Sequence, residues 1–352
     1  MSRAQTRTRT REVTMRQVWI PEHGGPEVLE IREAPDPDPQ PGEIRIRVEA
    51  SGINFADILS RMGLYRDAPP LPCVVGYEVA GTVDGIGEGV DGFSNADRVV
   101  SATRFRGYSD VVCVPAGQAR AIPDGLSFPD AASIPVNWLT AWWMLVRLAN
   151  LQPGETVLVH ACAGGVGLAA LQIVHHVGGR VIGTASASKH DRLRAFGVSH
   201  CIDYRSQDFE KEVMALTEGR GVDVVLDAVG GQSFAKSYRV LDVLGRLILF
   251  GASSFAPGTR RSLPATLRGL VQTPRFNPFS LMMKNRGVFG FNLGRIWHRA
   301  EETADMMAHI LDLVEDGTFT TVVDQTFSFD HAGDAHQYIQ DRKNFGKVIL
   351  TP

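Results

Sequence analysis

The chain has 352 residues, of which 44% are hydrophobic and 21% are charged, an ordinary balance for a globular protein. This length suits two domains better than a single core. The formal net charge of −3 gives no strong attraction to DNA, RNA or anionic membranes, so no nucleic-acid partner is expected. No run reaches the roughly 18 uncharged apolar residues of a membrane span, which excludes an integral membrane segment.

The N-terminal segment, residues 1–14, is rich in arginine and threonine and lacks the apolar region of a secretory signal. We expect a disordered tail, although an arm that contacts nucleic acid is an alternative. From Arg16 to Val114, apolar and polar residues alternate, as in Ile44–Val48, between frequent prolines and glycines. Short strands with frequent turns predict an antiparallel, barrel-like β-rich domain.

The pattern changes near Asp130, where Asp130–Leu148 reads as one or two helices. Strand and helix candidates then alternate as far as the C-terminal part of the chain, which predicts βαβ units and a parallel sheet. The strand candidates are Thr156–His160, Arg180–Thr184, His200–Ile202, Val222–Leu226, Arg246–Phe250 and Gly287–Phe291. The helix candidates between and after them are Val166–Val177, Gln207–Leu216, Ser233–Leu241 and Ala300–Glu315.

Two later segments are harder to assign. Gly258–Lys284 lacks clean periodicity and contains three prolines, so it could form a loop insertion, a lid or a dimer element. At the C-terminus, Val322–Phe327 and Lys347–Leu350 read as strands around a helix near Ala332–Asp341, and they could return to the first domain.

The four cysteines lie far apart and include no C-x-x-C pair: Cys73, Cys113, Cys162 and Cys201. This spacing disfavours a disulfide framework and a structural zinc site. Free thiols are typical of a reducing compartment, and we therefore expect a cytoplasmic protein.

The strongest local signal is TVLVHACAGGVG at Thr156–Gly167, in which a buried strand runs into a glycine-rich turn and a helix. The spacing Ala161-x-x-Gly164-x-x-Gly167 is a variant of the dinucleotide fingerprint, with Cys162 where the first glycine usually lies. Small residues admit a pyrophosphate, and the helix offers free N–H groups to it. A turn that only permits tight helix–strand packing is the alternative. The expected cofactor contacts are Ala163, Gly164, Gly165, Val166 and Gly167.

The end of the second strand indicates which dinucleotide is bound. NAD enzymes place Asp or Glu here, where it accepts from the ribose 2′-hydroxyl. This chain has no acid before Asp191 and offers Ser186, Ser188 and Lys189, which would bind a 2′-phosphate. We therefore predict NADPH, with Tyr204 near the adenosine; a solvated Lys189 at a helix N-terminus is the alternative.

Two further strand ends, Asp227–Gly231 and Phe250–Ser253, carry glycines. Such ends line the ligand crevice of an open α/β sheet, so Val229 and Gly251 could hold the nicotinamide half through backbone contacts. Ordinary loop glycines are the alternative.

Eight short motifs spread over the chain occur together in one protein family: GINFAD at Gly52–Asp57, GLY at Gly63–Tyr65, GYEVAG at Gly76–Gly81, AGGVG at Ala163–Gly167, GTASASKH at Gly183–His190, IDY at Ile202–Tyr204, GFNLG at Gly290–Gly294 and KNFGKV at Lys343–Val348. They resemble the zinc-free quinone oxidoreductases of the medium-chain dehydrogenase/reductase superfamily, and most closely its vesicle amine transport protein-like branch. The resemblance runs from about Met15 to the C-terminus.

The resemblance implies a GroES-like β-rich catalytic domain, residues 15–135 and 320–352, and a doubly wound Rossmann domain, residues 136–319, with a cleft between them. It implies NADPH bound through Lys189 and Tyr204, and usually a homodimer. The cofactor contacts expected from the shared motifs are Asn54, Phe291, Asn292, Leu293 and Asn344.

Zinc-dependent alcohol dehydrogenases of the same superfamily have a ligand Cys where this chain has Asn54, and a ligand His where it has Tyr77. Asn and Tyr are poor partners for Zn²⁺, and Glu78 alone could not hold the ion. We therefore predict no metal, and simple alcohol oxidation, which needs a Lewis acid, is not expected.

Hydride transfer to an electron-poor acceptor then needs positioning and a hydrogen-bond donor near the oxygen that becomes anionic. The candidates are Asn54 and Tyr65, with Tyr77 third. A Tyr at the matching place in related enoyl thioester reductases acts as proton donor, which favours Tyr65. The alternatives are a cleft-wall role for Tyr65 and a turn role for Asn54. Asp57 and His160 are expected to be structural.

Three functions stay open at this point. The first is an NADPH-dependent reductase of quinones, and the second is an NADPH-dependent reductase of enones or enoyl thioesters. The third is a non-catalytic NADPH-binding adaptor on membranes or vesicles, because binding residues do not prove turnover.

Overall fold

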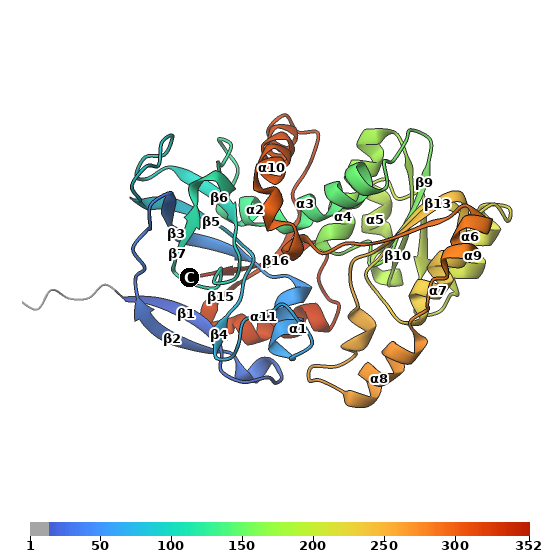
Figure 1. Cartoon of the computed structure of the whole chain (residues 1–352), viewed down its shortest axis with the longest axis horizontal. Coiled ribbons are helices and arrows are strands. Elements are labelled where there is room, and N and C mark those ends of the chain that lie inside the picture. Colours follow the sequence, from blue (N-terminus) through green and yellow to red (C-terminus); the bar gives the residue numbers. More distant parts are fainter. Residues whose placement is uncertain (1–13) are drawn as a thin grey trace, which may run out of the picture.

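The computed structural model describes residues 14–352 (Figure 1). The predicted disordered tail therefore lies outside the described residues, except for Thr14, which begins strand β1 (Thr14–Ile20) and pairs with Pro35 of β2 (Glu30–Pro35). No helix in this described part is both long and apolar enough to cross a membrane.

The first part of the chain forms antiparallel sheets, as the alternating pattern predicts. Its large sheet has the order β15-β16-β3-β5-β6-β8, with β7 also paired to β3. Ile44, Ile46 and Val48 of β3 are at most 3% exposed, while Arg45 and Arg47 on the opposite face bind Asp84. The strands are β3 (Glu43–Gly52), β4 (Cys73–Val74), β5 (Glu78–Ile86), β6 (Arg98–Ala102), β7 (Val111–Pro115) and β8 (Ala119–Ala121).

The C-terminal strands return to this sheet. Strand β16 (Lys347–Thr351) pairs antiparallel with β3, and β15 (Val323–Ser328) runs parallel to β16. Helix α11 (Ala332–Gln340) connects them, and α1 (Phe55–Arg61) follows β3 almost directly. The end of the chain thus lies beside residues near position 50, as Figure 1 shows.

The middle of the chain forms a six-stranded sheet whose neighbouring strands are all parallel, in the order β11-β10-β9-β12-β13-β14. In chain order this is 3-2-1-4-5-6, the arrangement of a doubly wound dinucleotide-binding sheet. The strands are β9 (Thr156–Val159), β10 (Arg180–Ala185), β11 (His200–Asp203), β12 (Val222–Asp227), β13 (Leu241–Leu249) and β14 (Gly287–Gly290). The helices are α4 (Gly165–Val177), α5 (His190–Ala195), α6 (Phe209–Leu216), α7 (Gln232–Arg239) and α10 (Ala300–Glu315).

The segment between the two sheets is helical, as predicted. It forms α2 (Phe128–Ala132), α3 (Pro135–Trp142) and a π-helical stretch, Trp143–Leu148. Helix α3 packs on α4, and Trp138, Leu139 and Met144 are almost fully buried. The domain limits given above stay a prediction.

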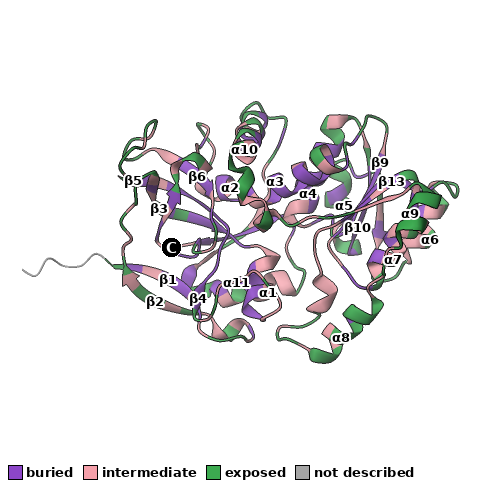
Figure 2. Cartoon of the chain, viewed as in Figure 1, coloured by how far each residue is buried: buried purple, intermediate pink, exposed green. Residues whose placement is uncertain are grey.

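Gly258–Lys284 contains two helices that the sequence analysis did not identify, α8 (Leu263–Gln272) and α9 (Pro278–Lys284), capped by Ser262 and Asn277. Their apolar residues face outward, so no stripe toward the core marks them in the sequence. Helix α8 is largely green in Figure 2. The exposed residues, each 61–83% accessible, are Leu263, Leu267, Leu270, Val271, Phe279, Met282 and Met283.

Candidate functional site

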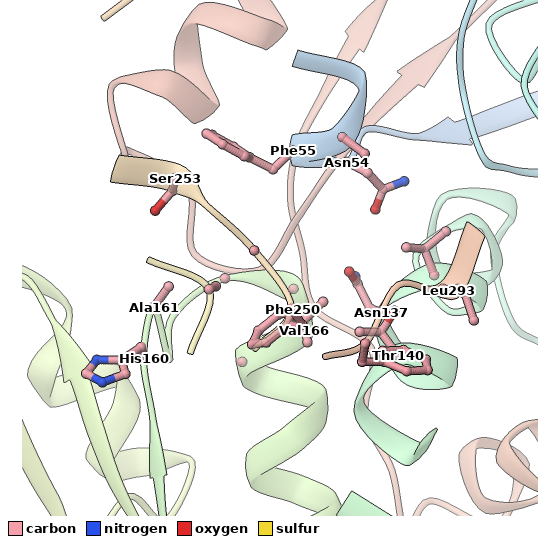
Figure 3. Close-up of a pocket in the computed structure, with 18 of the residues that line it drawn as sticks. Asn54, Phe55, Asn137, Thr140, His160, Ala161, Val166, Phe250, Ser253 and Leu293 are labelled. Atoms are coloured by element: carbon pink, nitrogen blue, oxygen red, sulfur yellow. The ribbon is translucent and has the colours of Figure 1, made fainter. Parts of the chain in front are cut away.

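A cleft of about 840 Å³ runs along the carboxyl ends of the parallel strands and is lined by residues of both sheet systems. Figure 3 shows Asn54, Phe250 and Leu293 around this space, each from a different part of the chain. Among its described lining residues the charged side chains are four cations and no carboxylate: Lys189, Lys236, Arg342 and Lys347. Lys236 is paired with Asp208 and Lys347 with Glu78, so Lys189 and Arg342 are the two that suit an anionic ligand.

The predicted glycine turn lies at the cleft, with Ala163, Gly165 and Val166 among the lining residues. A Cβ on Gly167 would lie 2.4 Å from the carbonyl oxygen of Cys162, so close packing of helix and strand requires this glycine. Gly164 is different, because only one backbone oxygen comes near its Cβ position, at 3.3 Å, and its remaining side is open. The turn therefore permits both tight packing and approach of a phosphate to the N-terminus of α4.

Lys189, Ser186 and Tyr204 meet at the β10–β11 end of the cleft. The Lys189 ammonium donates to the backbone oxygens of Arg342, at 2.8 Å, and Asn344. Burial lowers the pKa of Lys189. Ser188, predicted with this group, is exposed and does not line the cleft; its hydroxyl lies 3.3 Å from that of Ser186.

Arg342 is a lining residue that the sequence analysis missed. Its guanidinium lies 5.3 Å from the centroid of the Tyr204 ring. Burial raises the pKa of the Tyr204 phenol, but hydrogen bonds from Arg342 and Arg205 outweigh burial and lower it. Arg342 follows α11, 153 residues after Lys189, and no local motif marks it. Lys189 and Ser186 on one side, and Tyr204 with Arg342 on the other, can therefore surround a phosphate.

The opposite end of the cleft is formed by the ends of β12, β13 and β14. Val229, Gly251, Phe291, Asn292 and Leu293 all line it, as predicted. The carboxylate of Asp227 holds the first of these loops by accepting from Val229 N, at 2.8 Å. Asn344, also predicted, lines the cleft and donates its side-chain amide to Gly346 O at 2.9 Å.

Tyr65 lies across the cleft from these loops. Its hydroxyl donates to Asn292 Oδ1 at 3.4 Å, and Arg295 Nε donates to Asp67 at 2.8 Å, so two contacts join the loop after α1 to the segment after β14. Burial raises the pKa of Tyr65, which keeps the phenol protonated near neutral pH. Tyr77 stacks edge-on against Tyr65, and its hydroxyl is covered and lacks a hydrogen-bond partner among the described residues.

The buried side chains of Glu78 and Lys347 and the half-buried Asn54 form a triangle at the floor of the cleft, which we call the buried triangle. Lys347 Nζ donates to Asn54 Oδ1 at 2.7 Å, Asn54 Nδ2 donates to Glu78 Oε1 at 2.9 Å, and Lys347 pairs with Glu78. The side chains of Lys347 and Glu78 are 2% and 0% exposed. The second amide hydrogen of Asn54 has only Gly52 O, at 3.4 Å. An ammonium group thus contacts Asn54, one of the two positions at which no zinc ligand was expected.

Asn54 was a candidate hydrogen-bond donor to the acceptor oxygen, but this triangle engages most of its amide within the protein. Lys347 was missed, although a lysine in the apolar run KVIL is a signal that could have found it. Within residues 14–352, no group of three or more His, Cys, Asp or Glu side chains is placed to hold a metal ion.

Asp57 and His160, both predicted to be structural, are held by neighbouring groups of the protein, although His160 also lines the cleft. Asp57 is fully buried and accepts from the backbone N–H groups of Asn54, at 2.8 Å, and Gly76, at 3.0 Å. Burial raises the pKa of Asp57 to about 7. The buried His160 ring lies within hydrogen-bond distance of Thr184 and Ser237, and burial lowers its pKa.

Comparisons with known proteins agree with this architecture. Residues 40–127 match the family "Alcohol dehydrogenase GroES-like domain", and residues 196–350 match "Zinc-binding dehydrogenase". The human "Synaptic vesicle membrane protein VAT-1 homolog" is 39% identical over 325 residues, which cover 92% of this chain and 82% of the human protein.

Two solved structures are also similar. Escherichia coli quinone oxidoreductase complexed with NADPH matches with a TM-score of 0.85 and 32% identity, covering 96% of this chain and all of that one. The CurK enoyl reductase matches with a TM-score of 0.82 and 29% identity, covering 96% of this chain and 99% of that one.

Proposed function

This chain belongs to the zinc-free, quinone oxidoreductase-like family of the medium-chain dehydrogenases/reductases, and on that premise we propose that it uses NADPH to reduce quinones or similar conjugated carbonyls. The observation that carries the proposal is the cleft, which combines a glycine turn at a helix N-terminus with two cations, Lys189 and Arg342, that have no carboxylate partner among the described residues. NADPH, when bound, supplies the hydride.

The residues present fit this cofactor. The open side of Gly164 and the N-terminus of α4 would bind the pyrophosphate, and Lys189, Ser186, Tyr204 and Arg342 would surround the 2′-phosphate. The nicotinamide half would lie against the loops after β12, β13 and β14. Tyr65, whose phenol is protonated at neutral pH, would donate a hydrogen bond to the acceptor oxygen as negative charge develops there.

The test is a panel of quinones and enones with NADPH, followed by loss of nicotinamide absorbance. We expect oxidation of NADPH by at least one conjugated carbonyl, and much slower oxidation of NADH. Tight NADPH binding without consumption by any acceptor would contradict the proposed activity.

The similarity to an enoyl reductase supports double-bond reduction as a second activity to test. Tyr65→Phe should lower kcat/KM for enoyl thioesters by about 10²–10⁴-fold, the loss typical of a general acid, and for quinones much less. The control is Tyr204→Phe, which removes a hydroxyl at the other end of the cleft and should weaken NADPH binding instead. Equal activity of Tyr65→Phe and the unaltered protein on both acceptor classes would exclude Tyr65 as the donor.

The surface formed by helices α8 and α9 supports a second function, attachment to membranes. The chain has no acidic residue between Asp242 and Glu301, where nine lysines and arginines lie. Arg268 lies on α8 and Lys284 on α9, beside the exposed apolar side chains of these helices, whereas four others are paired with carboxylates of other segments: Arg246, Arg260, Arg295 and Arg299. Apolar and basic residues on the same surface helices are typical of proteins that bind anionic lipid surfaces.

Flotation with vesicles tests this attachment. We expect binding to vesicles that contain about one-third phosphatidylserine, weak binding to pure phosphatidylcholine, and a loss of at least tenfold in affinity in Leu267→Asp/Leu270→Asp because charged groups oppose insertion. Leu216→Asp, at an exposed leucine of α6, is the control and should change little. Equal binding of all three proteins would contradict attachment through α8.

The homodimer expected from the resemblance stays a prediction. Strand β14 lies at the edge of the parallel sheet, with no neighbour on its outer side among the described residues. Phe289 of this strand and the nearby Val243 and Leu244 are 39%, 61% and 71% exposed, which makes this edge a suitable contact surface for a second copy.

A further inference from the structure

Beyond the ends of β13 and β14, the cleft continues into a chamber beneath helix α10. Ala300, Thr303, Ala304 and Met307 line it at the spacing i, i+3, i+4 and i+7, which places them on one face of the helix. Ile296 and Trp297, which precede α10, complete this wall. We define these six residues as the acceptor chamber.

The position of the chamber follows from the strand order. Tyr204 follows β11, at one edge of the sheet, and Asn292 follows β14, at the other edge. A dinucleotide that places its 2′-phosphate near Tyr204 therefore directs its nicotinamide toward β14. Helix α10 follows β14 through two short 3-10 helices, Leu293–Arg295 and Trp297–Arg299, so the chamber adjoins the reactive end of the cofactor and not its phosphates.

The walls of the chamber are uncharged, unlike the rest of the cleft. Lys189 and Arg342 lie at the opposite end, and Lys347 is paired within the buried triangle. The charges of α10 lie on another face, where Glu302 binds Arg299 at 2.9 Å and also pairs with Arg147. Thr303 is the one polar member, and its hydroxyl is covered and lacks a partner among the described residues.

The apolar side of helix α10 has different surroundings along its length. Met306, Met307, Ile310 and Leu311 are at most 7% exposed and pack into the core, where α10 lies against α3 and β8. The first turns, at Ala300, Thr303 and Ala304, contact the open cleft, where apolar surface in contact with water is unfavourable unless a ligand covers it. Alanines at 300 and 304 leave space there that a leucine or phenylalanine would fill.

We propose that the acceptor chamber binds an apolar tail, so that the acceptor is an uncharged conjugated carbonyl, such as a quinone ring, that carries an alkyl or isoprenoid-like chain. This inference rests on the proposed reductase function and names its class of substrate. The ring would lie between the nicotinamide and Tyr65, and the tail would extend along Ala300, Ala304 and Met307. An acyl thioester whose carrier group is negatively charged is a poorer candidate, because the chamber has no cation to bind that group.

The test uses benzoquinones with one ring structure and methyl, pentyl or decyl tails, with the full chain and saturating NADPH. Each methylene that enters the chamber should lower KM by up to about fourfold, the factor that corresponds to burial of one CH₂, with kcat little changed. Isothermal titration with the same quinones and NADP⁺ measures the tail dependence of Kd without turnover.

Ala304→Phe should fill the chamber and abolish the advantage of the decyl tail, so that the methyl and decyl compounds have the same KM and Kd. Asp305→Phe is the matched control, because it adds the same side chain at the neighbouring, exposed position of α10. Both variants are first checked for unchanged NADPH affinity and melting temperature.

The two proposals fail in different ways. Tail-dependent binding that Ala304→Phe removes, without consumption of NADPH, would overturn the reductase function and retain the chamber. The proposed role of the chamber would be wrong if turnover and binding did not depend on tail length. It would also be wrong if Ala304→Phe and Asp305→Phe changed the tail dependence equally.

Discussion

Lys347→Met is expected to lower the free energy of unfolding by about 3–5 kcal/mol, the usual loss when one partner of a buried ion pair is removed. The reason is that Glu78, which is 0% exposed, would be left buried without the ammonium that compensates it. Asn54 Oδ1 would lose its donor at the same time. Denaturation in guanidinium chloride, followed by circular dichroism, measures the change.

Two variants separate this effect from the loss of any lysine. Lys343→Met removes a lysine that is 60% exposed, in the same C-terminal segment, and should change stability by less than about 0.5 kcal/mol. Lys347→Met/Glu78→Gln leaves no buried charge unpaired and should recover much of the loss. A single Lys347→Met variant as stable as the unaltered chain would show that the triangle does not carry this energy.

Lys189→Glu is expected to reduce the preference for NADPH over NADH by about 100-fold or more. A charge-assisted hydrogen bond contributes about 1.5–3 kcal/mol, and a carboxylate would in addition repel the 2′-phosphate. The backbone contacts of Lys189 to Arg342 and Asn344 would be lost for both cofactors, so the ratio of the two dissociation constants isolates the phosphate. Titration of cofactor fluorescence measures both constants.

The control for this variant is Lys211→Glu, which makes the same charge change at an exposed position of α6 that does not line the cleft. It should leave the ratio unchanged. An unchanged ratio in Lys189→Glu would refute the placement of the 2′-phosphate beside Tyr204 and Arg342.

The sequence by itself determined the parts of this protein that depend on neighbouring residues. Period-two alternation at Ile44–Val48 identified an antiparallel strand, and the alternation of strand and helix after Thr156 identified the parallel sheet. The glycine turn was identified because its function depends on a few adjacent residues. The missing acid after β10 indicated the cofactor for the same reason, since it is a local property of one strand end.

Only the tertiary structure decided what lies opposite these motifs. Asn54 and Lys347 are 293 positions apart, and the run KVIL predicts a strand without showing that its lysine meets Glu78. Arg342 reaches Tyr204 only because the C-terminal strands return to the first sheet. The two helices of Gly258–Lys284 escaped detection because their apolar residues face solvent, so they lack the core-facing stripe on which prediction depends. Helix α10 was predicted, but the sequence does not show that its first turns line the cleft.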